Sequence, residues 1–306
     1  MIYRVRHVTR YAYETPVDLA THLVHLTPRA ASGQEVVRST LLVDPPASRR
    51  TDGTDYFGNP IACLFHEEPH TSFVLTAVSD VSVAPTRSLT PGPAWESVVR
   101  AVRHDASAWQ AAEFTLASPA CPVSARAGEW VATSFTPGRP IGDAVMHLTR
   151  RIYTDFSFRA GVTGLATTID EILDGRAGVC QDFTNLMISG LRWLGVPARY
   201  ISGYIRTYPR GDAAQLLGAD QSHAWVGVWL GPEMGWVGFD PTNGILGGGE
   251  HVITAYGRDY RDISPVRGMI LGGGRGSMSV EVDLLPCDEA QARGVLFPEE
   301  KRPAPG

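Results

Sequence analysis

Long apolar runs are absent from this 306-residue sequence, and cysteines are few. No stretch approaches the roughly 18 apolar residues that a membrane helix needs, so we expect no transmembrane segment. The N-terminus, MIYRVRHVTRYAYETP, lacks the apolar core of a signal peptide, which predicts a cytoplasmic protein. The four cysteines, at positions 63, 121, 180 and 287, lie far apart without a CxxC pair. They suit neither a zinc site nor a disulfide framework.

An excess of positive charge is also missing. The net charge is −5, and the acidic residues are spread along the chain. This distribution argues against nucleic acid or a membrane surface as the main partner. Hydrophobic residues make up 43% of the chain and charged residues 19%, close to the average for soluble globular proteins.

Turn residues and apolar spacing predict two domains. Residues 1–84 alternate between short apolar stretches and turn signals such as Asp52-Gly53, which is typical of strands. The segment 85–95 is rich in proline and is interpreted as a linker. Residues 96–290 carry helical spacing first and strands later, and 291–306 are interpreted as a tail. The order of strands, helices and strands predicts an α+β fold rather than alternating βαβ units.

Within the second domain, one helix and one hairpin are clearly delimited. The helix is expected to begin near Cys180 and to stop at Gly195, because glycine favours the position after a helix end. Strands over 224–230 and 235–239 are separated by a short turn, which predicts a β-hairpin. The polar segment 207–221 before this hairpin is interpreted as a lid or as an ordinary connection.

Cys180 stands where a reactive thiol is expected. A cysteine in the first turn of a helix lies near unpaired backbone N–H groups and the positive end of the helix dipole. Both stabilise the thiolate, which is the nucleophilic form of cysteine. Position alone does not distinguish this role from that of a small apolar residue at a buried helix start.

The hairpin supplies the partners that such a thiol needs. His223 begins one arm and Asp240 ends the other, so the hairpin brings Asp240 to within about three residues of the position opposite His223. A small register shift or bulge would then let the carboxylate orient the imidazole. A nucleophile, a base and a group that fixes the base are the parts of a catalytic triad.

The stretches GVCQDFTNLMISGLRWLGVPARYISGY (178–204) and SHAWVGVWLGPEMGWVGFDPTNG (222–244) resemble the bacterial transglutaminase-like superfamily, whose members are largely regarded as cysteine proteases. The beginning, YRVRHVTRYAYETPVDLATHLVHLTPR (3–29), looks like the N-terminal domain that accompanies one bacterial branch of that family. The segment GRDYRDISPVRG (257–268) adds to the resemblance, which covers most of the chain.

The resemblance implies a papain-like catalytic domain, with the nucleophile at a helix N-terminus packed on an antiparallel sheet. Cys180 matches the family's nucleophile, His223 its general base and Asp240 the residue that orients the base. The usual motif continues with a small residue and a histidine, where this sequence has Thr184 and Asn185. This departure leaves the triad intact and concerns only contacts in the second turn of the helix.

Three further residues are candidates for the site. An acyl-transfer site needs hydrogen-bond donors for the developing oxyanion, and the backbone N–H of Cys180 is one. Tyr153 is a possible second donor, or a core residue on a helix. Gln181 follows the nucleophile, and Trp225 lines a cleft or packs within the hairpin.

These features predict hydrolysis of an amide or peptide bond through an acyl-enzyme. Transfer of the acyl group to an amine is the alternative, and a non-catalytic peptide-binding scaffold is a rival of another class. We expect a peptide, protein or small amide as substrate, and no metal or cofactor. The sequence contains no DxDxDG run, so calcium dependence finds no support. The N-terminal domain is interpreted as a docking or partner interface.

Overall fold

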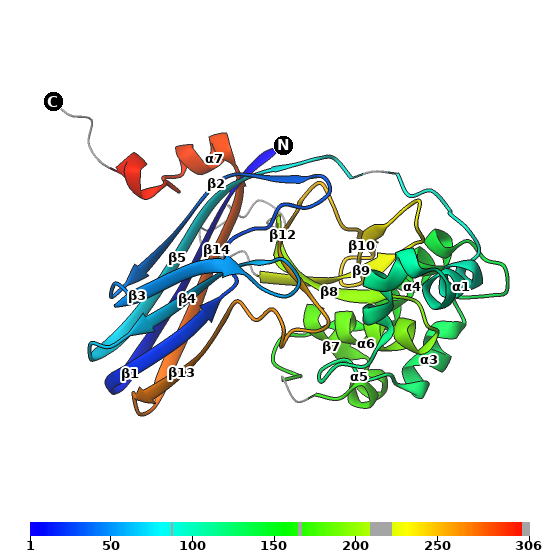
Figure 1. Ribbon diagram of the computed structural model, residues 1–306, viewed down its shortest axis with the longest axis horizontal. Coiled ribbons are helices and arrows are strands. Elements are labelled where there is room, and N and C mark those ends of the chain that lie inside the picture. Colours follow the sequence, from blue (N-terminus) through cyan, green and yellow to red (C-terminus); the bar gives the residue numbers. More distant parts are fainter. Residues whose placement is uncertain (87, 165–166, 209–221, 302–306) are drawn as a thin grey trace.

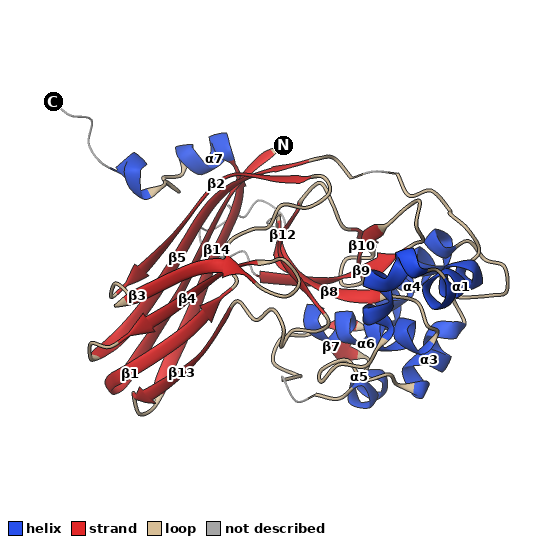
Figure 2. Cartoon of the chain, in the orientation of Figure 1, coloured by secondary structure: helices blue, strands red, loops and turns tan. Residues whose placement is uncertain are grey.

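The computed structural model describes residues 1–86, 88–164, 167–208 and 222–301. A large strand-built part and a part that combines a smaller sheet with helices lie side by side (Figure 1). Figure 2 shows that most helices gather on the second part, away from the large sheet. The fold is α+β, as the sequence predicts. Most of the interpreted lid segment, residues 209–221, lies outside the described residues.

The large sheet is antiparallel and is built around one long strand, β1 (Ile2–Val24). β5 (His70–Val83) and β4 (Pro60–His66) pair with successive parts of β1, and β2 (Gln34–Asp44) and β3 (Arg49–Thr54) extend the sheet beyond them. The early residues therefore form the strand-rich domain that the turn signals predict. Residues 84–94, apart from residue 87, contain no helix or regular strand, and the linker over 85–95 stays a prediction.

Two strands near the C-terminus complete this sheet. β13 (Val266–Gly272) and β14 (Gly276–Pro286) both pair antiparallel with β1. The prediction that residues 96–290 form one domain is therefore corrected at its end. The 23 residues of β1 present a long edge, and position along the chain does not determine which sheet a late strand joins.

The interpreted tail is also corrected. α7 (Cys287–Ala292) follows β14, and a 3₁₀ turn covers Pro298–Lys301. Phe297 between them is fully buried, and the guanidinium of Arg38 lies 3.7 Å from the centre of its ring. Residues up to 297 thus pack against the N-terminal domain, because Phe297 removes a large apolar surface from water there.

The second part combines helices with a five-stranded antiparallel sheet in the order β11-β10-β9-β8-β12. Its strands are β8 (Ala198–Ile205), β9 (Ser222–Trp229), β10 (Trp236–Asp240), β11 (Ile245–Leu246) and β12 (His251–Gly257). Its helices are α1 (Trp95–His104), α2 (Trp109–Ala112), α3 (Ala125–Ala132), α4 (Ile141–Asp155), α5 (Ile169–Gly175) and α6 (Cys180–Trp193), with 3₁₀ turns at Ala106–Ala108 and Glu113–Thr115. A short parallel pair, β6 (Ser157–Phe158) and β7 (Ala177–Gly178), precedes α6.

The best-delimited helix and the hairpin are both confirmed. α6 begins at Cys180, its apolar residues from Phe183 to Leu191 are buried, and Gly195 beyond its end has a φ of +80°. That left-handed conformation suits glycine, which is why the helix stops there. β9 and β10 form the expected hairpin, with Phe239 opposite Val226.

The two parts share a buried apolar contact. Tyr3, Val5, Val81 and Val83 of the large sheet, with Val282 and Leu284 of β14, pack against Tyr204 of β8 and Val252 of β12. The outer edge of β12 is closed by amide side chains of the N-terminal domain. Gln34 bonds both the N–H and the C=O of Ile253, and Asn59 does the same for Tyr256. β12 is therefore fixed from both sides.

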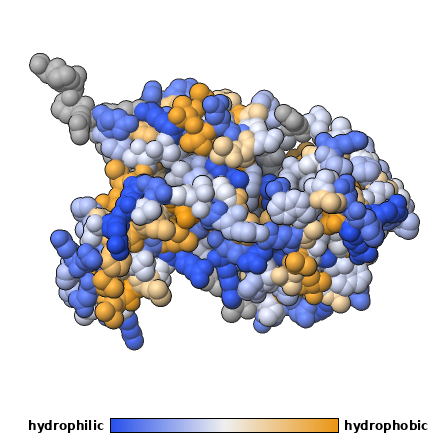
Figure 3. All heavy atoms as spheres, in the orientation of Figure 1, coloured by the Kyte–Doolittle hydropathy of each residue, from blue (hydrophilic) through white to orange (hydrophobic). Residues whose placement is uncertain are grey.

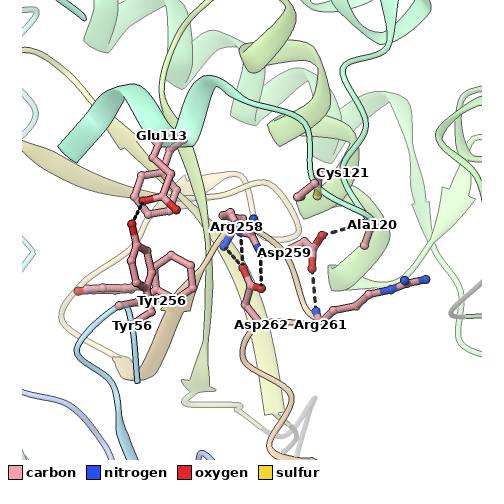
Figure 4. Close-up of polar contacts among 12 residues, drawn as sticks. Tyr56, Glu113, Ala120, Cys121, Tyr256, Arg258, Asp259, Arg261 and Asp262 are labelled. Carbon is pink, nitrogen blue, oxygen red and sulfur yellow. Dashed lines mark hydrogen bonds and ion pairs between the residues drawn. The ribbon is translucent and has the colours of Figure 1, made fainter. Parts of the chain in front are cut away.

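The segment 258–262 leads from the five-stranded sheet back to the large sheet and is held by an ion pair and by hydrogen bonds (Figure 4). The guanidinium of Arg258 pairs with the carboxylate of Asp262, while buried Asp259 accepts the backbone N–H of Ala120 at 2.8 Å. Nearby, the hydroxyl of Tyr56 donates to Glu113 across the two parts at 3.3 Å. Within the segment GRDYRDISPVRG (257–268), which contributes to the family resemblance, residues 258–262 thus have a structural role.

Candidate active site

Cys180 is the first residue of α6 and is only partly buried. The start of this helix is fixed by Asp182, whose carboxylate accepts the backbone N–H of Val179 at 2.7 Å and the hydroxyl of Thr163 at 2.6 Å. A side chain at Gly178 would lie 2.7 Å from this carboxylate, so glycine is required there. Asp182 thus caps the helix at Val179, directly before Cys180.

His223 lies between Cys180 and Asp240. Its Nε2 donates to Oδ2 of Asp240 at 2.9 Å, and Cys180 interacts with the ring electrostatically. Burial disfavours the charged ring, but the interactions with Asp240 and Cys180 outweigh this effect and raise the pKa of His223 to about 10. The imidazolium is therefore the stable form of His223 near neutral pH.

Asp240 is completely buried and accepts five hydrogen bonds. Its Oδ1 accepts the backbone N–H groups of Thr242 and Asn243 at 3.0 and 3.2 Å. Its Oδ2 accepts His223, the Nδ2 of Asn243 at 2.7 Å and the Nε2 of His251 at 3.1 Å. Burial favours the neutral acid, yet the bonds from the two imidazoles outweigh it and hold the pKa of Asp240 well below its usual range. A carboxylate that only accepts is ionised, so both Nε2 atoms carry protons.

The hairpin register explains how the pair forms. With Phe239 opposite Val226, Asp240 stands diagonal to His223, two residues from the directly opposed position. The register of the hairpin from Trp236 to Phe239 is regular, so the bulge that the sequence left open is not needed.

Trp225 borders this cluster. It is buried, its ring stacks on that of His223 with centroids 5.8 Å apart, and its edge meets the ring of His251 at 5.0 Å. Side chains at Gly238 or Gly247 would come within 3.2 and 3.0 Å of its Nε1. The structure thus places Trp225 at the site, where it shields the imidazole–carboxylate contacts from water.

The remaining candidate residues are Gln181 and Tyr153. Gln181 is half-buried in the first turn of α6, beside Cys180 in the chain. Tyr153 is 56% exposed at the end of α4 and packs on the turn after Asp240, because a side chain at Gly244 would lie 3.0 Å from its ring. Their part in oxyanion binding stays a prediction.

The departure from the family motif has a structural counterpart. Asn185 accepts a hydrogen bond from the thiol of Cys121 at 3.2 Å, and Thr184 is fully buried with its hydroxyl unpaired. Burial raises the pKa of Cys121 to about 12, so this thiol is a hydrogen-bond donor rather than a nucleophile. Position 185 supports the core behind α6.

Sequence reasoning missed His251 and Asn243. His251 begins β12, and only the pairing of β12 with β8 brings it beside Asp240. Asn243 follows Asp240 in a turn, and its closeness in sequence was the one signal available for it. His223, Asp240 and His251 place ligand-type atoms within 4.8 Å of one another. Their closeness is accounted for by hydrogen bonds, since both imidazoles donate to the same carboxylate oxygen.

Comparison with protein families agrees with this architecture. Residues 3–82 match the bacterial transglutaminase-like N-terminal region, and residues 129–241 match the transglutaminase-like superfamily. The second match contains Cys180, His223 and Asp240, the three candidate catalytic residues. The chain belongs to the transglutaminase-like superfamily, and its helix-bearing part is a cysteine-based catalytic domain.

Full-length relatives occur in mycobacteria. The uncharacterized protein Rv2569c of Mycobacterium tuberculosis is 38% identical over 293 residues, covering 94% of this chain and 93% of its own length. The uncharacterized protein ML0607 of Mycobacterium leprae is 31% identical, with 92% and 97% covered. A structure titled "Putative Cysteine Protease" from Cytophaga hutchinsonii aligns with a TM-score of 0.69 at 23% identity, covering 94% of this chain and 91% of that one. That likeness shows the same fold.

Among the described residues, no helix is long and apolar enough to cross a membrane.

Proposed function

We propose that the protein hydrolyses an amide or peptide bond through an acyl-enzyme on Cys180. The observation that carries the proposal is the hydrogen bond from His223 to the buried carboxylate of Asp240, together with the electrostatic interaction between Cys180 and the same imidazole. A thiol at a helix N-terminus, a base beside it and a group that orients the base are the components of thiol-dependent acyl transfer.

The first half-reaction starts from a thiolate–imidazolium pair. The sulfur of Cys180 attacks the substrate carbonyl carbon, and the carbonyl oxygen takes the negative charge. The backbone N–H of Cys180 is the donor we assign to this oxyanion. His223 then gives its proton to the leaving nitrogen, the C–N bond breaks, and a thioester with Cys180 and a free amine result.

The second half-reaction releases the acid. Neutral His223 takes a proton from water as the oxygen attacks the thioester carbonyl, and the C–S bond breaks to regenerate the thiolate–imidazolium pair. Asp240 holds the ring in one tautomer through both steps, because its Oδ2 accepts the Nε2–H.

Acyl transfer to an amine remains the alternative. The same thioester reacts with either nucleophile, with His223 as base for both. A protein-glutamine gamma-glutamyltransferase of Pseudomonas aeruginosa is 35% identical over 89 residues, which cover 28% of this chain and 13% of that protein. We favour hydrolysis because the resemblance is to a branch regarded as protease-like.

A binding scaffold that retained the fold is less well supported. Asp240 is fully buried and charged, a state that costs free energy unless every lone pair is used. A scaffold has no need of a buried carboxylate aimed through an imidazole at a partly exposed thiol.

The test combines peptide libraries with a labelled primary amine. Wild-type protein and Cys180→Ala are incubated with both, and cleavage and amine incorporation are measured across amine concentrations. Cleavage that exceeds incorporation and disappears in Cys180→Ala supports the proposal. Dominant incorporation would favour the transferase, and equal products from both proteins would favour the scaffold.

For the N-terminal domain we propose docking of a peptide or protein. Figure 3 shows hydrophobic surface at the end of the large sheet where β1 and β13 lie. The exposed apolar residues of these strands include Leu19, Met269 and Leu271. Exposed apolar surface of this kind marks interaction sites in soluble proteins. We also propose that the protein acts in the cytoplasm.

A further inference from the structure

We propose that His251 is a fourth, positioning residue of this site, which shares the carboxylate of Asp240 with His223 and thereby fixes how strongly that carboxylate holds the His223 ring. The inference rests on the proposed triad and adds a residue that neither the family motif nor the hairpin supplies. His251 comes from β12, outside the segment that matches the superfamily.

The geometry is that of two imidazoles on one oxygen. The Nε2 of His223 and the Nε2 of His251 lie 2.9 and 3.1 Å from the same Oδ2 of Asp240. The two rings are tilted at 45° with centroids 6.1 Å apart, and Trp225 contacts both. His251 and Asp240 are both buried, so water does not replace this bond.

The other nitrogen of His251 is held by a single glycine. Its Nδ1 lies 3.0 Å from the carbonyl oxygen and 3.3 Å from the backbone nitrogen of Gly248. The C=O of Gly248 can accept a hydrogen bond from Nδ1 when Nδ1 carries a proton, and the N–H of Gly248 can donate one when it does not. The nitrogen therefore has a partner in either form. Gly248 has a φ of +148°, a conformation that side chains rarely adopt. The turn before β12 thus fixes the ring while its Nε2 faces Asp240.

The strand that carries His251, β12, is hydrogen-bonded along both of its edges. β8 pairs with one edge of β12, with Ile205 opposite His251. Gln34 and Asn59 bond the other edge at Ile253 and Tyr256. The N-terminal domain therefore reaches the catalytic carboxylate through β12, which gives that domain a role in the site besides docking.

Sharing the carboxylate limits its effect on His223. Within the described part of the chain, the titratable groups that face His223 are Cys180 from α6, Asp240 from β10 and His251 from β12, while β8 places Gly203 opposite it. Each N–H that donates to Oδ2 stabilises the negative charge of the carboxylate and so weakens its interaction with the other donors. With His251 removed, that charge concentrates on His223 and Asn243, and the imidazolium becomes more stable. The carboxylate also loses a contact that orients it.

The experiment compares His251→Leu with His251→Gln. Leucine removes the donor, whereas the glutamine amide can place an N–H near the position of Nε2. Alkylation of Cys180 by iodoacetamide is followed by mass spectrometry across pH. A thiolate–imidazolium pair gives an acidic step when it forms and an alkaline step when His223 loses its proton. We expect His251→Leu to move the alkaline step upward by about 0.5–1 pH unit and to lower kcat about 10- to 100-fold.

His251→Gln is expected to keep the alkaline step within about 0.3 pH unit of wild type, since the donor is retained. His147→Gln is the matched control, because His147 lies on α4 and bonds Ser134 rather than Asp240. Thermal unfolding of each variant is recorded in parallel. A lower kcat in His251→Leu without movement of the alkaline step would assign His251 a structural role only and overturn the proposal. A pH profile and kcat in His251→Leu that match those of the wild type would overturn it too. Absence of both steps at Cys180 in the wild type would instead overturn the proposed triad.

Discussion

Asn59 satisfies both backbone polar groups of Tyr256: its Oδ1 accepts the N–H at 2.8 Å, and its Nδ2 donates to the C=O at 2.7 Å. The amide side chain makes the two hydrogen bonds that a neighbouring strand would otherwise make, because it offers a donor and an acceptor at the spacing of a peptide unit. Asn59 is fully buried in the loop between β3 and β4. With the Gln34–Ile253 contact, it joins the N-terminal domain to the edge of the five-stranded sheet.

Replacing Asn59 with alanine should destabilise the protein by about 2–4 kcal/mol, because two buried backbone groups lose their partners. Chemical denaturation of wild type and Asn59→Ala measures the change. Gln110→Ala is the control, since Gln110 is exposed on α2. A change within about 0.5 kcal/mol of that control would show that the contact does not hold the two parts together.

The sequence places the three candidate residues on definite elements because the local signals for those elements are clear. The helix start at Cys180 is marked by apolar spacing and by Gly195 at its end, and the hairpin is marked by its short turn. These signals place Asp240 near His223 without any knowledge of tertiary structure. The same local rules predict the α+β class.

The sequence does not predict His251 or the completed large sheet, since both depend on long-range pairing. His251 reaches Asp240 only because β12 pairs with β8, some fifty residues earlier in the chain. β13 and β14 join the large sheet by pairing with β1, and nothing local in the sequence says that they do so. Apolar alternation specifies a strand and its buried face, not its neighbour.

Cys180 should be the fastest-reacting thiol. Burial raises the pKa of Cys121 to about 12, and burial with the neighbouring Asp80 raises that of Cys287 to about 11. Cys63 is exposed and is the internal control for access without activation. Alkylation near pH 7 followed by peptide mass spectrometry should modify Cys180 first, and equal rates at Cys180 and Cys63 would contradict activation by His223.

Stability should fall as pH rises through the titration of His223. The folded-state pKa of about 10 exceeds the unfolded value of about 6.5, so the folded protein binds the proton more tightly. The contribution is complete below about pH 6.5 and is lost as pH approaches 10. The unfolding free energy of wild type relative to His223→Gln should therefore decrease between about pH 6.5 and 10. A constant difference over this range would mean that His223 is not charged in the folded state.

Removal of metal ions should leave the reaction unchanged. The Nε2 atoms of His223 and His251 donate protons to Asp240 and so have no free lone pairs for a metal. Dialysis against EDTA followed by Cys180 alkylation and peptide hydrolysis tests this. Loss of either activity, restored by a divalent cation, would replace the hydrogen-bonded account of this cluster with a metal site.

Asp240→Asn should abolish most turnover. An amide has one acceptor oxygen where the carboxylate has two, so in either orientation its NH2 group would face donors: the two imidazoles, or the backbone N–H groups of Thr242 and Asn243. By analogy with serine triads we expect turnover to fall on the order of 10⁴-fold, with slower Cys180 alkylation at neutral pH. Asp259→Asn is the matched control, because Asp259 is equally buried but bonds Ala120 and Arg261 in the segment 258–262. That variant should lose stability while it retains Cys180 reactivity. Near-normal turnover in Asp240→Asn would mean that another residue orients His223, and a loss of the same size in Asp259→Asn would mean that global stability accounts for the effect.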